Sequence, residues 1–144
     1  RFLMRIELGY PDREAERALL QGADRRDLIG SIKPCLAPGQ LMELQSSVRH
    51  VHVAPALLDY IQSLVEHTRR SPDYTNGLSP RASLSLLHAA RAWALLQGRD
   101  LVLPEDVQAV LPGIAGHRLR PANEARMTSG ADTARALIAA VPIP

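Results

Sequence analysis

The chain has 144 residues with a formal net charge of +2, and 46% of them are hydrophobic but only 3% aromatic. This length suits one domain, and the abundance of alanine and leucine favours helices over a sheet. The chain is less basic than nucleic-acid-binding domains usually are. The lone Cys35 excludes a disulfide framework. The sequence has no membrane-crossing run and no signal-peptide pattern, so we expect a cytoplasmic protein without membrane insertion.

The first eight residues alternate in character, with Phe2, Met4, Ile6 and Leu8 on one side of the pattern. This period of two predicts a β-strand. A single strand is not stable alone, so we expect its sheet partners to lie upstream in a longer parent protein. The start of the chain at Arg1, rather than at a methionine, favours the same interpretation.

Helical patterns follow along the rest of the chain, with apolar residues three and four positions apart. The predicted helices cover residues 12–21, 38–48, 54–70, 82–96, 104–115 and 131–141. Residues 51–53 form an extended link, and residues 71–77 and 118–130 are predicted loops. The fold class is therefore all-α, a helical bundle preceded by one strand.

The start of the helix at 82–96 carries an unusual charge. Ser79 is a favourable N-cap and Pro80 a favourable first helical residue, which places Arg81 in the first turn. The helix dipole is already positive there, so a cation is unfavourable unless an anion lies opposite. Free backbone N–H groups and a guanidinium together suit a phosphate. An ordinary exposed arginine on a solvated face is the alternative.

Arg81, Ser85 and His88 share one narrow polar stripe, because they are spaced four and three residues apart. The remaining faces of this helix are almost wholly apolar. We therefore expect it at the centre of the domain.

Several catalytic motifs are absent from the sequence. There is no G-x-x-x-x-G-K-[ST] loop, so this chain alone cannot cradle a triphosphate and should be inactive as an enzyme. His50 and His52 flank one residue, but two histidines make a poor zinc site, and we predict no metal site.

Eight segments of the sequence together resemble the C-terminal lid of MoxR-type AAA+ ATPases. Four carry most of the resemblance: Gly77-Leu78-Ser79-Pro80-Arg81-Ala82-Ser83-Leu84, Ala89-Ala90-Arg91-Ala92, Gln97-Gly98-Arg99-Asp100 and Pro104-Glu105-Asp106-Val107. Weaker matches are Arg1-Phe2-Leu3-Met4-Arg5-Ile6 with Gly9-Tyr10-Pro11, then Gly116-His117-Arg118-Leu119, and Val141-Pro142-Ile143-Pro144.

The resemblance implies a division of the chain and a parent protein. Residues 1–10 would be the end of the AAA+ core, with a remnant strand and linker, and residues 11–144 the helical lid domain. The parent would be a homohexameric ATPase with chaperone-like remodelling or metal-cofactor insertion roles. It would contact its own core, neighbouring subunits and von Willebrand factor A domain proteins.

The resemblance also implies roles for individual residues. Arg81 matches the sensor 2 arginine, which contacts the γ-phosphate, and Ser79 and Pro80 belong to the same nucleotide-binding segment. Arg1 matches a candidate arginine finger that acts on a neighbouring subunit's ATP. ATP and Mg²⁺ would be bound by the full-length parent, whose Walker elements lie upstream, and not by this chain alone.

Two other classes of function stay open from the sequence. The helix at 104–115 suggests a helix-turn-helix, but Glu105 and Asp106 at its start would repel nucleic-acid phosphates. A protein-interaction bundle without a nucleotide role would use the apolar residues of the first segment. An open Arg81 favours the phosphate role, whereas pairing with an internal carboxylate would exclude it.

Overall fold

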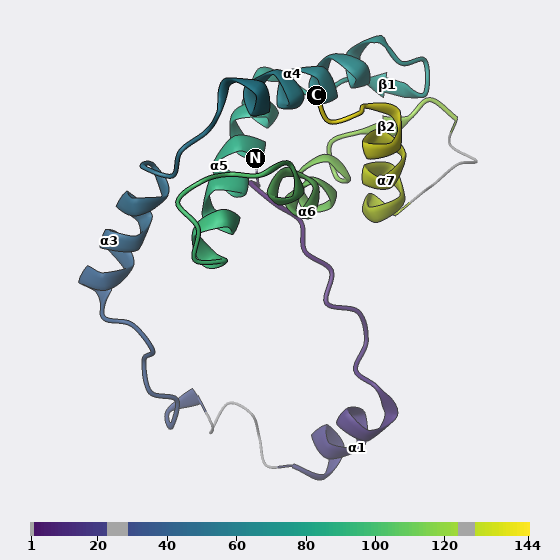
Figure 1. The fold of residues 1–144 in the computed structure, drawn as a ribbon. Coiled ribbons are helices and arrows are strands. Elements are labelled where there is room, and N and C mark those ends of the chain that lie inside the picture. Colours follow the sequence, from purple (N-terminus) through teal and green to yellow (C-terminus); the bar gives the residue numbers. More distant parts are fainter. Residues whose placement is uncertain (1, 23–28, 124–128) are drawn as a thin grey trace.

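A computed structural model describes residues 2–22, 29–123 and 129–144, and it is helical as predicted (Figure 1). Four helices form one compact body together with a small two-stranded sheet (Figure 1). In chain order the elements are α1 (Arg13–Gln21), α3 (Pro38–Val48), α4 (Pro55–Arg70), β1 (Tyr74–Asn76), α5 (Pro80–Leu96), α6 (Pro104–Ala115), β2 (Arg120–Pro121) and α7 (Gly130–Ala140).

The core lies between α4, α5, α6 and α7, and α6 packs against both α5 and α7. It is built from aliphatic side chains and one tyrosine. The largest fully buried hydrophobic residues are Tyr60, Leu64, Leu78, Leu86, Val107, Leu111, Ile114 and Leu137. None of the helices in the three described stretches is long and apolar enough to cross a membrane.

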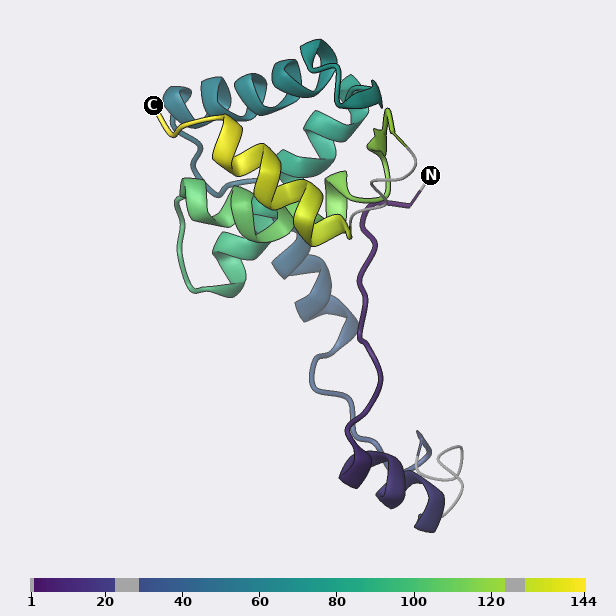
Figure 2. The same ribbon diagram turned by 90° about the vertical axis from the view of Figure 1, so that its right-hand side faces the viewer.

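Two helices lie outside the core of this body, although α3 contacts α5. Neither α1 nor α3 buries a residue, and α1 lies far from the four packed helices in both views (Figures 1 and 2). Asp12, predicted as the first residue of this helix, instead caps it, accepting a hydrogen bond from the backbone N–H of Ala15 at 2.8 Å. Of the two, only α3 therefore lies next to the packed helices.

The segment expected to be a strand finds no partner strand among the described residues. Residues 2–10 run extended, but the structure assigns no strand to them. The backbone N–H of Arg5 bonds instead to the carbonyl of Gly113 in α6, at 2.9 Å. The backbone N–H and C=O groups within a helix already bond to one another, so α6 cannot pair with this segment as a strand would.

The predicted loops contain pairings that local patterns did not reveal. β1 and β2 pair antiparallel, so Tyr74–Asn76 from one predicted loop meets Arg120–Pro121 from the other. The extended link also pairs with a distant segment. The backbone carbonyl of His52 accepts a hydrogen bond from the backbone N–H of Val102 at 3.0 Å, and His52 forms a parallel β-bridge with Leu101. These contacts hold the segments that connect the helices against one another.

The central position expected for α5 is only half right. The face of α5 that points toward the core is buried, with Ala82, Leu86 and Ala90 each at most 1% exposed. Its outward face leaves Leu84 60% and Leu96 78% exposed. Apart from its polar stripe the helix is apolar, but the body covers only one side of it.

Candidate functional site

The site is the N-terminus of α5, where the cap forms as predicted. The Ser79 hydroxyl accepts a hydrogen bond from the backbone N–H of Ala82 at 3.3 Å, and the Ser79 carbonyl accepts from Ser83 at 3.2 Å. Pro80 has no N–H. The backbone N–H of Arg81 is therefore the donor of this first turn that the helix does not use.

The Arg81 side chain is open. It is exposed and makes no hydrogen bond or ion pair with the residues that the structure describes. The condition that would exclude a phosphate role, pairing with an internal carboxylate, is not met in these ranges. Ser85 donates its hydroxyl proton to the Arg81 carbonyl at 2.9 Å, and His88 is exposed, so the polar stripe faces solvent.

A buried hydroxyl fixes the start of α5 to the end of α4. Thr68 is 1% exposed, and its Oγ1 accepts a hydrogen bond from the backbone N–H of Leu78 at 3.0 Å. The same hydroxyl donates to the Val65 carbonyl at 2.7 Å. Leu78 is 2% exposed, so its N–H has no access to water. Thr68 thus holds the residue just before the cap.

Arg69 holds the same residue by its carbonyl group. Its Nε donates to the Leu78 carbonyl at 2.9 Å. The backbone of Gly77 lies against α4 so closely that an added Cβ would be 2.5 Å from Arg69 Cγ and 2.6 Å from Arg69 Cα. Thr68, Arg69 and Gly77 form what we call the latch, which sets where Arg81 projects.

The sequence analysis missed the latch, although a signal was present. Thr68 falls on the apolar face of its helix, with Leu64 and Val65. A buried hydroxyl needs a hydrogen-bond partner, and the one that Thr68 accepts from, the backbone N–H of Leu78, is ten residues away in the sequence.

An apolar groove of about 510 Å³ runs between α4 and α5 beside the first turn of α5. Pro80 and Ser83 form one end of its α5 wall, so the groove adjoins the open Arg81. Its lining is mainly aliphatic, with two charged residues: Leu58, Ile61, Gln62, Val65, Glu66, Arg69, Pro80, Ser83, Leu84 and Leu87.

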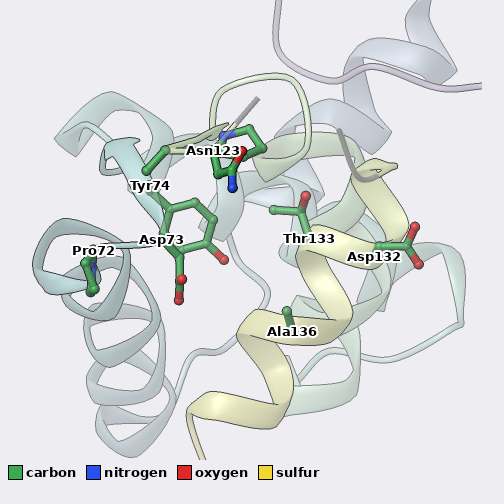
Figure 3. Close-up of a pocket in the computed structure, with 9 residues that line it drawn as sticks. Pro72, Asp73, Tyr74, Asn123, Asp132, Thr133 and Ala136 are labelled. Atoms are coloured by element: carbon green, nitrogen blue, oxygen red, sulfur yellow. The ribbon is translucent and has the colours of Figure 1, made fainter. Parts of the chain in front are cut away.

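A second pocket, of about 350 Å³, lies between the small sheet and α7, where Thr133 and Ala136 face Tyr74 (Figure 3). Burial and the adjacent Asp73 raise the pKa of Tyr74. Hydrogen bonds from the Ser129 hydroxyl and backbone lower the pKa of Asp132, which also lines the pocket. Two carboxylates make this pocket unfavourable for a phosphate, and no predicted site residue lines it.

The remaining predicted site residue is Arg1, which lies outside the described residues. The described residues hold no group of three histidine, cysteine, aspartate or glutamate side chains that could bind a metal.

Comparison with known families decides what kind of domain this is. The AAA lid domain model matches residues 66–141, which hold the latch, Arg81 and helices α5 to α7. The chain belongs to the AAA lid domain family. The match begins inside α4 and ends after α7, so it covers most of the compact body and neither α1 nor α3.

Relatives of the lid are of the MoxR type. The chain is 38% identical to "Chaperone MoxR1" of Mycobacterium tuberculosis over 130 residues, which are 83% of this chain and 33% of that protein. It is 32% identical to "Protein MoxR" of Paracoccus denitrificans over 169 residues, covering 100% of this chain and 49% of that protein. The lid is therefore a MoxR-type AAA+ lid, as its motifs indicate.

A solved structure has the same fold. The crystal structure of a "putative ATPase" from Cytophaga hutchinsonii superposes with a TM-score of 0.84 at 28% identity, over 100% of this chain and 47% of that one. The lid spans about a third to a half of the length of these related proteins.

Proposed function

We propose that this lid closes over the ATP of a MoxR-type AAA+ ATPase and that Arg81 contacts the γ-phosphate as its sensor 2 arginine. A guanidinium at that phosphate offsets the charge that develops in phosphoryl transfer. Because α5 is part of the body, a contact made at Arg81 is passed to the whole lid. The lid then couples the state of the nucleotide to its own position.

The open state of Arg81 is the observation that supports this proposal most directly. A solvated arginine in the first turn of a helix gains nothing from the helix dipole, and it has no acid to pair with in the described parts of the chain. The latch adds a second support, because one buried and one partly buried hydrogen bond hold Leu78, the residue that precedes the cap. A fixed donor is what phosphate recognition requires.

The residues at this helix start fit a phosphate but not a complete nucleotide site. The Arg81 guanidinium and its backbone N–H can both donate to phosphate oxygens, the Ser79 hydroxyl can donate its proton, and Pro80 sets the helix direction. The loop that binds the phosphates and the ligands of Mg²⁺ come from the core of the parent ATPase in this proposal.

The wider roles follow from the family resemblance. We propose that the parent is a cytoplasmic homohexamer in which Arg1 acts as an arginine finger on a neighbouring subunit's ATP. Chaperone-like remodelling or metal-cofactor insertion in partner proteins, including von Willebrand factor A domain proteins, would be the output of lid movement. These roles place the lid between nucleotide and partner.

The test compares ATP hydrolysis by the full-length ATPase with that of its Arg81→Ala and Arg81→Lys variants. We expect Arg81→Ala to lower kcat about tenfold or more, at least ~1.4 kcal/mol of lost transition-state stabilisation. Arg81→Lys should recover only part, because an ammonium cannot reproduce the planar fork. Arg120→Ala, which removes an exposed arginine of β2, is the matched control.

Hydrolysis and ATP affinity that are unchanged in Arg81→Ala, with the hexamer intact, would reject the sensor role. Arg81 would then be a surface charge. A loss in the Arg120→Ala control of the same size would also reject it, because the effect would then be one of overall charge.

A further inference from the structure

The first described residues are fastened to the end of α6. Nη2 of Arg118 donates to the carbonyl of Phe2 at 2.8 Å, and Nη1 donates to the carbonyl of Leu3 at 3.1 Å. The backbone N–H of Arg5 donates to the carbonyl of Gly113 at 2.9 Å. The path of the chain away from the compact body therefore starts at a fixed point, just after Arg5.

The residues that follow are all exposed. We call residues 6–21 the arm; it consists of an extended stretch and α1, which lies far from the four packed helices in both views (Figures 1 and 2). Apolar side chains gathered on a short exposed stretch mark an interaction site. The described parts of the chain bury none of the large hydrophobic residues of the arm, which are Ile6 at 73%, Leu8 at 94%, Tyr10 at 101%, Leu19 at 49% and Leu20 at 83% exposure.

The helix of the arm is short for one that stands alone. α1 has 9 residues, and isolated helices shorter than about 12 residues are marginal in water. Ala15, Ala18 and Leu19 share one face, because they are spaced three and four residues apart, and Arg17 lies on the opposite face. An amphipathic helix is stabilised mainly by packing of its apolar face. The face that carries Leu19 is therefore the one that a partner covers.

The related proteins contain the residues that can supply this partner. The chain spans 33% and 49% of the two MoxR relatives and 47% of the solved ATPase, so half or more of each protein lies elsewhere. The superposition on the solved ATPase covers 100% of this chain and so includes the arm. A part of the parent that is joined directly to the fastened residues 2–5 is held beside the arm at high effective concentration.

We infer that the apolar face of the arm, centred on Leu19, docks on the core of the parent ATPase, in the part of the same polypeptide that precedes residue 1. This inference rests on the proposed core of the parent but not on the role of Arg81. The boundary between core and lid, expected at residue 10, then lies beyond α1. Arg118 lies where the two meet, because it joins α6 to the residues that lead into the arm.

Photo-crosslinking in the full-length ATPase tests which surface α1 contacts. The crosslinking residue p-benzoylphenylalanine replaces Leu19 in one variant and Arg17, on the opposite face, in the control. We expect the Leu19 variant to crosslink to residues that precede residue 1, with a product that has the mass of one polypeptide on a denaturing gel. The Arg17 variant should give little of this product.

Hydrogen exchange in the same full-length protein tests the docked face independently. Leu19→Glu should speed up amide exchange of α1 at least about tenfold, because the docked helix loses a buried leucine. Arg17→Glu adds the same side chain on the opposite face and should leave the exchange of α1 unchanged. If Leu19→Glu does not fold, the crosslinks alone decide.

Three results would overturn the inference. A crosslinked product with the mass of two polypeptides would place α1 on a neighbouring subunit. Crosslinks from position 19 to the groove between α4 and α5 would make the arm a part of the lid. Equal acceleration of exchange by Leu19→Glu and Arg17→Glu would show that neither face is docked. The sensor role of Arg81 is measured by its own variants, so it can stand or fall separately.

Discussion

Arg99 and Asp106 form a two-armed ion pair that joins the turn after α5 to the first turn of α6. Nη1 of Arg99 lies 2.7 Å from Oδ2 of Asp106, and Nη2 lies 2.5 Å from Oδ1. Asp106 is 1% exposed and also accepts a hydrogen bond from the backbone N–H of Leu103 at 2.8 Å. The pair joins two of the quoted motifs in this chain, Gln97-Gly98-Arg99-Asp100 and Pro104-Glu105-Asp106-Val107.

We predict that Arg99→Ala destabilises the chain, because it leaves a buried carboxylate without its charged partner. The midpoint of thermal unfolding, followed by circular dichroism, should fall by at least about 5 °C. Arg135→Ala is the control, since Arg135 pairs with the exposed Asp132 and such pairs contribute little. Equal midpoints for the two variants would show that the Arg99 pair does not stabilise the turn.

The same carboxylate should make stability depend on acid pH. Burial alone would raise the pKa of Asp106, but the hydrogen bonds from Arg99 and Leu103 outweigh it, and the pKa is lowered from its usual value. A lowered pKa in the folded state stabilises the fold above the unfolded value, about pH 4, and this contribution is lost as the pH falls below it.

We therefore expect Asp106→Asn to be less stable than wild type at pH 7 and to lose less of its stability between about pH 5 and pH 2. Urea unfolding at a series of pH values measures both. Parallel curves for the two proteins would mean that other carboxylates cause the acid sensitivity.

Helix positions were predictable from the sequence because their signals are local. Pro80 and Pro104 stand in the first turns of α5 and α6, and Gly98 follows α5 with a φ of +74°. Each of these residues acts on its own few neighbours. Arg81 was predictable for the same reason, since its place in the first turn follows from the cap.

Contacts between distant residues were not predictable in this way. The Thr68–Leu78 and Arg118–Phe2 hydrogen bonds join elements whose approach is set by packing of the whole body. The contact made by residues 2–5, within the segment expected to be a strand, was not predictable for a related reason. Alternation describes what a segment could pair with, whereas its neighbour here is the end of α6.

Gly77→Ala tests how tightly the latch is packed. The new Cβ would meet the backbone of Arg69, with 2.6 Å to Cα and 2.8 Å to N, and a backbone cannot rotate away. We expect a loss of about 1 to 3 kcal/mol in the free energy of unfolding. Gly39→Ala, in the first turn of α3 with no atom near its Cβ, should be neutral or slightly stabilising. A neutral Gly77→Ala would show that α5 can start further from α4.

Thr68→Val tests the hydrogen bond at the centre of the latch. Valine keeps the shape of threonine but removes the acceptor of the buried Leu78 N–H, so we expect a loss of about 1 to 3 kcal/mol. Thr68→Ser keeps the hydroxyl and removes only a methyl group. It should preserve the hydrogen bond from the Leu78 N–H while losing some packing.

The measurement that separates these variants is amide exchange at Leu78, together with chemical denaturation. Exchange at Leu78 should rise in Thr68→Val and stay slow in Thr68→Ser, even if both variants lose stability, because only the serine can still accept the bond. In the full-length ATPase, Thr68→Val should also reduce the contribution of Arg81 to kcat for ATP hydrolysis, because the start of α5 is no longer fixed. Slow exchange at Leu78 in Thr68→Val would mean that Arg69 alone holds the start of α5 in place.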